Sequence, residues 1–180
     1  MVRCGSHSNP AMPISPTMTD RSVRPAPNLR NPIHLLAFGL GSGVLPYAPG
    51  TFGTLVAVPL YLLLAPLPLA AYLGTVLLGF CAGIWLCGRA SQDLGVHDHG
   101  GIVWDEIVGY LFTMTLAPQG WLWVLLGFML FRLFDILKPW PIRTIDRQVG
   151  GGFGIMLDDL LAGFYGMLAL LLIDYFGVFS

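Results

Sequence analysis

The sequence predicts an all-α protein, a polytopic bundle of helices embedded in a membrane and joined in short hairpins. Of its 180 residues, 55% are hydrophobic and only 11% are charged, whereas soluble domains carry about 25% charged residues. From residue 31 to residue 88 the chain has no Asp, Glu, Lys or Arg. Such a long uncharged segment is expected only in a bilayer or in a very large core, so a membrane protein is the natural interpretation.

The N-terminal segment, residues 1–31, differs from the rest of the chain. It holds four arginines against one aspartate, it is rich in proline, and it has no continuous apolar block. Such a composition cannot bury enough apolar surface to fold, so we expect a disordered, basic, Pro-rich tail. The apolar core of a cleavable signal peptide is missing from it. The membrane-embedded domain would then comprise residues 32–180.

A Gly- and Pro-rich segment, GLGSGVLPYAPGTFGTL, opens this domain at residues 39–55. It predicts a loop of irregular backbone at membrane depth, which must be buried in protein or line a polar cavity. Exposed amides in such a loop, including those of Gly50 and Thr51, are able to contact a phosphate. A plain connector between the tail and the first span is the alternative, and the lysine of a P-loop is missing.

Two apolar hairpins and one final span are expected after this loop. The first hairpin has arms at 55–65 and 69–87, and the second has arms at 102–117 and 121–137. Residues 160–176 form the last span. A span needs roughly 20 apolar residues, so the shorter arms require extension by their flanks, tilt, or burial inside the bundle.

The charges of the domain gather on one side of these hairpins. Thirteen of the fourteen charged residues after the tail lie between residues 89 and 159, near the hairpin ends remote from the tips, and both tips are uncharged. Arg89, Lys138, Arg143 and Arg147, with the basic tail, predict by the positive-inside rule that this side is cytoplasmic. We therefore expect a multi-pass protein of a bacterial inner membrane, with its C-terminus in the periplasm.

Two pairs of adjacent carboxylates stand at predicted helix starts. Asp105 and Glu106 head an apolar helix, and Asp158 and Asp159 stand at the start of the last span. Taken alone, each pair is also explained by helix capping and by the tolerance of a helix N-terminus for negative charge. A charge at the bilayer centre costs roughly 2.5–3.5 kcal/mol, so carboxylates that gather with other charges there indicate a functional site.

A third group lies in the segment FRLFDILKP, where Arg132, Asp135 and Lys138 advance in steps of three. On a helix each is rotated about 60° from the last, so the three cover an arc of about 120°. The spacing is equally consistent with a ladder of ion pairs within one helix and with part of an active site. Pro139 would end that helix.

The three groups together bring five carboxylates and two cations to one membrane face. This set predicts a hard metal ion beside a phosphate, because Mg²⁺ takes oxygen ligands and Arg and Lys neutralise phosphate charge. Adjacent helical carboxylates point about 100° apart. In each pair, one member is therefore free to bind metal while the other orients water, caps the helix or faces solvent.

Four sequence blocks resemble those of a known family. GSGVLPYAPGTFGTL, GVHDHGGIVWDEIVG, FRLFDILKPWPIRTIDR and GGGFGIMLDDLLAG are similar to blocks of phosphatidylglycerophosphatase A, in the family's order, over about residues 32–175. The resemblance implies a Mg²⁺-dependent phosphatase that converts phosphatidylglycerophosphate in the bilayer to phosphatidylglycerol and phosphate, without nucleic acid as a partner. It implies these metal-binding or catalytic residues: Asp105, Glu106, Asp135, Asp158 and Asp159. It also implies phosphate binding by Arg132 and Lys138.

The chemical route and one other class of function stay open at the level of sequence. A carboxylate either orients an attacking water or forms an aspartyl-phosphate. A small ion-coupled membrane transporter, with the glycine segment as a broken helix, is the alternative function, although we see no internal repeat. A lipid phosphotransferase is less favoured, because the acidic spacing of the CDP-alcohol family is missing.

Overall fold

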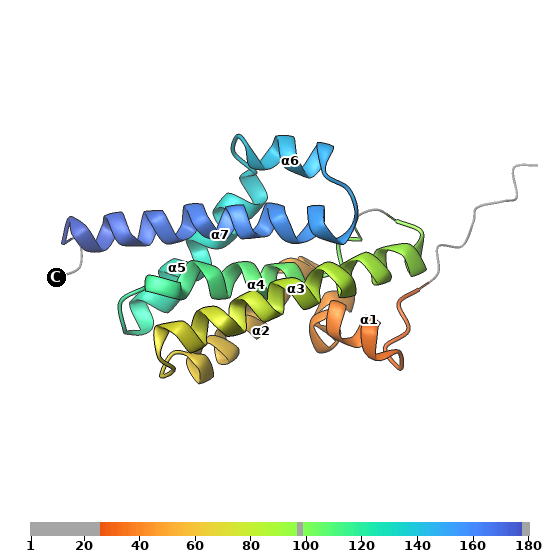
Figure 1. The fold of residues 1–180 in the computed structure, drawn as a ribbon, viewed down its shortest axis with the longest axis horizontal. Coiled ribbons are helices and arrows are strands. Elements are labelled where there is room, and N and C mark those ends of the chain that lie inside the picture. Colours follow the sequence, from red (N-terminus) through yellow and green to blue (C-terminus); the bar gives the residue numbers. More distant parts are fainter. Residues whose placement is uncertain (1–25, 97–98, 178–180) are drawn as a thin grey trace, which may run out of the picture.

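The computed structural model describes residues 26–96 and 99–177, and these residues are all-helical (Figure 1). The all-α prediction is therefore confirmed for this part of the chain. The predicted disordered tail falls mostly on residues 1–25, which lie outside the described residues.

Long helices make up most of the described bundle. They are α2 (Pro49–Leu64), α3 (Leu69–Leu94), α4 (Trp104–Thr113), α5 (Trp121–Leu137) and α7 (Gly151–Tyr175). Two of them, α3 and α7, are long and apolar enough to cross a membrane, whereas α2 is apolar but shorter. At a rise of 1.5 Å per residue, α3 and α7 are each about 37–39 Å long, which exceeds a hydrocarbon core of about 30 Å.

Short helices connect these elements and pack on their ends. They are α1 (Pro32–Ala37), the 3₁₀ helices η1 (Gly39–Val44) and η2 (Met114–Leu116), and α6 (Ile142–Gln148). The side chain of Asn31 caps α1 by accepting a hydrogen bond of 3.0 Å from the amide of Ile33. In Figure 1, α6 lies over the N-terminal part of α7, whose C-terminal end is at the far end of the molecule from α1.

The four predicted arms are largely helical, and α5 has the predicted bounds. The Gly- and Pro-rich segment differs from the prediction in its second half. Its backbone is irregular at Leu40, Gly41 and Ala48, which have positive φ angles, but α2 begins at Pro49 and makes residues 49–55 helical. Proline favours the first helical turn because its φ is fixed near the helical value and its missing N–H has no partner there anyway.

The predicted start of the last span is wrong, because α7 begins at Gly151 and not near residue 160. One of the glycines before Asp158, Gly152, allows close helix packing. A Cβ atom on Gly152 would lie 1.9 Å from the carbonyl oxygen of Ile84 and 2.7 Å from the amide nitrogen of Gly88, both on α3. Only glycine allows this approach of two helix backbones at residue 152, and residues 151–154 lie inside α7 with Gly150 as its N-cap.

A second close crossing joins α4 to α7. A Cβ on Gly163 would lie 2.5 Å from the carbonyl oxygen of Gly109. Between them, the Thr113 hydroxyl donates to the carbonyl oxygens of Gly109 at 3.0 Å and Gly163 at 3.3 Å. Gly109 and Gly163 each lie about one turn beyond the acidic pair of their own helix. The crossing therefore fixes the position of the two acidic pairs relative to each other.

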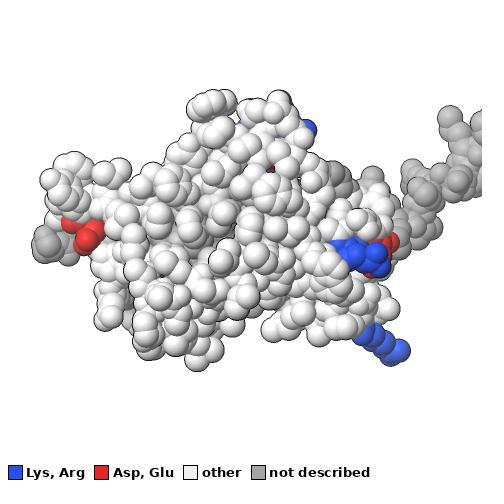
Figure 2. Space-filling view, in the orientation of Figure 1, with Lys and Arg blue, Asp and Glu red and all other residues white. Residues whose placement is uncertain are grey.

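The outer surface is largely apolar. On the face shown in Figure 2, red and blue atoms gather at the two ends and near α6, and the broad middle is white. Large apolar side chains are exposed on the long helices, among them Leu77 and Leu78 of α3 and Leu125 and Met129 of α5. A soluble monomer rarely presents such a continuous apolar surface. Together with the two candidate spans, this surface indicates a membrane-associated protein.

Candidate active site

The five predicted carboxylates come from three helices that converge. Asp105 and Glu106 lie in the first turn of α4, Asp135 lies in the last turn of α5, and Asp158 and Asp159 lie in the third turn of α7. Three of the five are buried, with Asp159 only 3% exposed. The charges of the other four all act on Asp159. We call these five residues the acidic cluster.

The position of Asp158 and Asp159 corrects the sequence interpretation in one respect. They do not cap α7 or lie in its first turn, because the helix starts seven residues before Asp158. The explanation of this pair as helix-start charges therefore fails. Buried carboxylates in a helix interior need partners, which makes a functional or ion-pairing role necessary.

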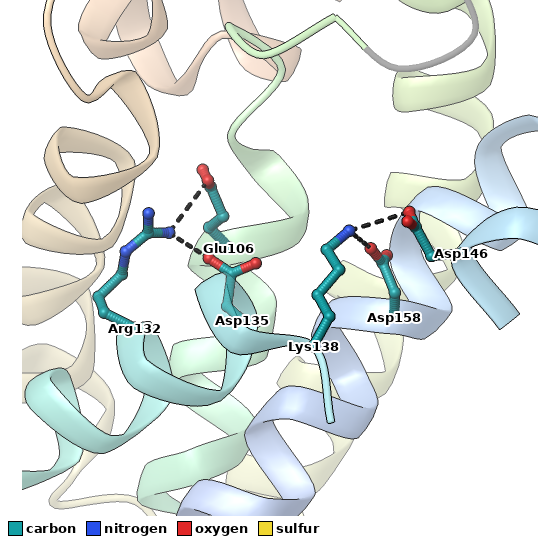
Figure 3. A network of polar contacts seen from close by, with 6 residues as sticks. All are labelled: Glu106, Arg132, Asp135, Lys138, Asp146 and Asp158. Carbon is teal, nitrogen blue, oxygen red and sulfur yellow. Dashed lines mark hydrogen bonds and ion pairs between the residues drawn. The ribbon is translucent and has the colours of Figure 1, made fainter. Parts of the chain in front are cut away.

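Arg132 joins α5 to α4 within the cluster. Its Nη1 donates to Glu106 Oε1 at 3.2 Å and to Asp135 Oδ2, as Figure 3 shows. The side chains of Arg132, Glu106 and Asp135 are only 13–14% exposed. The contact with Asp135 is the predicted pair within one helix, but the contact with Glu106 crosses to another helix.

The N-terminus of α2 closes over this arginine. A Cβ on Gly50 would lie 1.9 Å from Glu106 Oε1 and 2.9 Å from Arg132 Nη1. Gly50 is therefore the residue that lets the α2 backbone approach the ion pair. The amide of Thr51 donates to the carbonyl oxygen of Ala48 at 3.0 Å, within the first helical turn. Phosphate contacts of Gly50 and Thr51 stay a prediction.

Lys138 forms a second cluster with acids from α6 and α7. Its Nζ donates to Asp158 Oδ2 at 2.6 Å and to Asp146 Oδ1 at 2.9 Å (Figure 3). Lys138 follows the last residue of α5 with a φ of 42°. Burial lowers the pKa of Lys138, but the bonds and charges of Asp158 and Asp146 outweigh burial and raise this pKa above its ordinary value. The ammonium therefore stays charged at neutral pH.

The donor set of the acidic cluster suits a hard cation. Asp159 Oδ2 is buried and has no hydrogen-bond partner, although burial of a carboxylate oxygen is costly without one. Within the described residues, no group of three Asp, Glu, His or Cys side chains has the arrangement of a ready-made metal site. Mg²⁺ does not require one, since it commonly binds one or two carboxylates and completes its shell with water and phosphate oxygens.

Comparison with known proteins identifies the family. The family model for phosphatidylglycerophosphatase A matches residues 35–174. The chain is 52% identical over 136 residues to phosphatidylglycerophosphatase A of Escherichia coli, which covers 75% of this chain and 79% of that protein. The chain belongs to the phosphatidylglycerophosphatase A family.

Other relatives extend the comparison. Phosphatidylglycerophosphatase A of Haemophilus influenzae is 46% identical over 160 residues, 88% of this chain and 98% of its own. A protein of Bacteroides thetaiotaomicron, named provisionally as a phosphatidylinositol-3-phosphatase, is 40% identical over 145 residues, 74% of this chain and 88% of its own. No solved structure matches the chain. The family resemblance predicted from four sequence blocks is thus confirmed.

Arg132 and Lys138, the two predicted cations, have different carboxylate partners. The sequence placed Arg132 and Lys138 together on one helical face, but the structure gives each its own pair of carboxylates. Sequence reasoning also gave no role to Asp146, which pairs with Lys138 from eight residues away. Its only signal was its place among the charges that follow Pro139, because its proximity to Lys138 depends on the turn into α6.

Proposed function

We propose that this protein hydrolyses the terminal phosphomonoester of phosphatidylglycerophosphate and releases phosphatidylglycerol and phosphate. The observation that carries the proposal is the family match, whose range of residues 35–174 includes the whole acidic cluster and both cations. Family membership does not favour the transporter alternative. The protein is on this proposal a phosphoric monoester hydrolase of phospholipid biosynthesis.

Mg²⁺ is the proposed cofactor, held by Asp159 with Asp105 and Asp158 as its neighbours. When bound, it would supply positive charge that polarises the phosphate. The unpartnered oxygen of Asp159 supports this assignment. Chelation of divalent cations should therefore abolish phosphate release, and added Mg²⁺ should restore it.

The cations of the chain bind the phosphate in this proposal. The guanidinium of Arg132 exchanges one of its two carboxylate partners for an oxygen of the terminal phosphate, and Lys138 does the same from its own cluster. Both side chains are already held near the acids by charge-assisted bonds. In this proposal the two cations would supply fixed positive charge where the equatorial oxygens of the phosphoryl group gain charge in the transition state.

The released carboxylates act on water. Glu106 or Asp135, once its bond to Arg132 is exchanged, accepts a proton from the attacking water while the water oxygen bonds to phosphorus. The bond from phosphorus to the glycerol oxygen breaks, and that oxygen leaves as a hydroxyl by taking up the proton that the carboxylate accepted. Direct attack inverts the configuration at phosphorus, whereas an aspartyl-phosphate intermediate retains it. A chiral thiophosphate substrate would distinguish the two routes.

The membrane setting is also a proposal: a multi-pass protein of a bacterial inner membrane with its site toward the cytoplasm. α7 continues for seven residues before Asp158 and for sixteen after Asp159, which correspond to about 10 Å and about 24 Å of helix. The acidic cluster therefore lies nearer one end of this candidate span. The basic residues Arg143 and Arg147 near that end support its cytoplasmic location under the positive-inside rule.

The proposal is tested by measuring phosphate release from phosphatidylglycerophosphate by the purified protein in detergent, with and without Mg²⁺. Phosphatidic acid and phosphatidylinositol 3-phosphate serve as competing substrates. We expect metal-dependent release that is fastest with phosphatidylglycerophosphate, lost in Asp159→Asn and kept in Asp174→Asn. Asp174 is the matched control, since it lies in the same helix about 22 Å further along. Absence of release by the wild-type protein at any Mg²⁺ concentration would overturn the proposal.

A further inference from the structure

A pocket of about 480 Å³ lies beside Lys138, where the chain turns from α5 into α6. Lys138, Arg143 and Arg147 line it together with the apolar residues Leu137 and Trp140. Its volume is within the range of about 300–1,000 Å³ that is usual for small-ligand sites. None of the five residues of the acidic cluster lines this pocket.

The two arginines of the pocket are available to bind an anionic ligand. Arg143 and Arg147 are four residues apart on α6, so they lie on the same face of that helix. No ion pair within the described residues includes either of them. The charge of Lys138, in contrast, is balanced by Asp158 and Asp146. The pocket thus combines two uncommitted guanidinium groups with one shared ammonium.

The surroundings of the pocket favour a lipid headgroup as its ligand. Trp140 is 80% exposed and Leu137 is 63% exposed, and exposed tryptophan beside arginine is typical of the level of the phospholipid headgroups in a membrane. Guanidinium groups bind phosphate oxygens in bidentate fashion. A phosphodiester flanked by glycerol carbons matches both the charged and the apolar parts of the lining.

Lys138 connects this pocket to the acidic cluster. It lines the pocket, and its Nζ bonds Asp158 of the acidic cluster at 2.6 Å. A ligand with one phosphate in the pocket and another at the acidic cluster would therefore pass Lys138. The proposed substrate has two such groups, since a glycerol separates its internal phosphodiester from its terminal phosphomonoester.

We propose that Arg143 and Arg147 bind the internal phosphodiester of the lipid substrate while its terminal phosphate lies at the acidic cluster. This inference rests on the proposed function, because only a two-phosphate lipid occupies both places. On this proposal α6 favours phosphatidylglycerophosphate over phosphatidic acid, because phosphatidic acid has no phosphodiester for the arginines of α6 to bind. Arg143 and Arg147 are positioning residues on this view, and their loss should act mainly on KM.

Binding of phosphatidylglycerol tests the pocket without catalysis, since this lipid has the phosphodiester but no terminal phosphate. The double variant Arg143→Gln with Arg147→Gln is compared with the wild type in neutral detergent. Arg30→Gln with Arg89→Gln is the matched control, because it removes two positive charges outside the pocket. We expect binding to weaken about 10- to 100-fold in the pocket variant and less than about twofold in the control, as for loss of charge-assisted hydrogen bonds.

Kinetics on phosphatidylglycerophosphate then connect the pocket to the substrate. The pocket variant should raise KM by a similar factor, and phosphatidylglycerol should compete with the substrate in the wild type. Equal binding of phosphatidylglycerol by the wild type and the pocket variant would overturn the inference even if the protein hydrolyses the substrate. If phosphatidylglycerol fails to compete, the pocket holds a neighbouring lipid and the inference is also wrong.

Failure of the proposed function has a different signature. In that case the wild type releases no phosphate from phosphatidylglycerophosphate, whatever the binding result. Loss of phosphatidylglycerol binding in the pocket variant would then still show a phosphodiester site, but its role in positioning a phosphatase substrate would be refuted.

Discussion

Substitution of Gly50 by alanine is the sharpest test of the α2 end of the site. The added Cβ would lie 1.9 Å from Glu106 Oε1 and 2.9 Å from Arg132 Nη1, so the carboxylate has to move or α2 has to withdraw. Glu106 is a flexible side chain, but its bond to Arg132 and its 14% exposure leave it little room. Overpacking of this kind costs about 1–3 kcal/mol. Displacement of Glu106 would also weaken its bond to Arg132.

Two measurements on Gly50→Ala follow from this geometry. Phosphate release should fall by about 100-fold, as for loss of one well-placed polar group in an active site, and the thermal unfolding midpoint in detergent should decrease. Gly74→Ala is the control, because a Cβ on Gly74 meets nothing within 4 Å and alanine should stabilise a helix by about 0.4–1 kcal/mol. Full activity of Gly50→Ala would show that the contact of α2 with Glu106 is unimportant for catalysis.

Three further substitutions probe the rest of the site. Asp159→Asn should reduce phosphate release by about 100-fold or more without lowering the unfolding temperature, since it replaces a buried acid that is surrounded by four other acids; a clear loss of stability would contradict this. Lys138→Met leaves Asp158 buried without its cation and should destabilise the fold by about 3 kcal/mol, measured by thermal unfolding, at the low end for buried pairs because Lys138 is 25% exposed. Gly163→Ala brings a Cβ within 2.5 Å of the Gly109 carbonyl oxygen and should cost about 1–3 kcal/mol, with activity lost as α4 and α7 separate; an unchanged unfolding midpoint would refute the close crossing.

The sequence predicted helices well where apolar runs end in strong breaks. The arm at 121–137 follows the PQG turn and precedes Pro139, and α5 has these bounds. It predicted poorly where glycine has a packing role. The glycines from residue 151 onward are helical, and one of them, Gly152, packs against the backbone of α3. Such packing depends on another helix, which local composition does not reveal.

The site was predictable as a set of residues but not as a pattern of contacts. Charged residues are so sparse in this chain that those within apolar helices stand out as candidate site residues. In the structure, α4, α5 and α7 bring the five carboxylates together. Helical spacing correctly paired Arg132 with Asp135. Spacing carried no information on Glu106 or Asp146 as partners, because these contacts cross from α5 to α4 and α6.

The balance of charge explains why the proposed reaction should need a metal ion. The five residues of the acidic cluster and Asp146 provide six carboxylates, against only two cations, Arg132 and Lys138, which gives a formal charge of −4. A phosphomonoester dianion that enters this set is repelled unless positive charge enters with it. Arg132 and Lys138 alone do not provide it, because each is already shared between two carboxylates. The uncommitted arginines of α6 attract the lipid from the membrane side, and a divalent cation near Asp159 would make the remaining carboxylates compatible with its terminal phosphate. Substrate affinity should therefore rise with Mg²⁺ even in a variant that cannot hydrolyse.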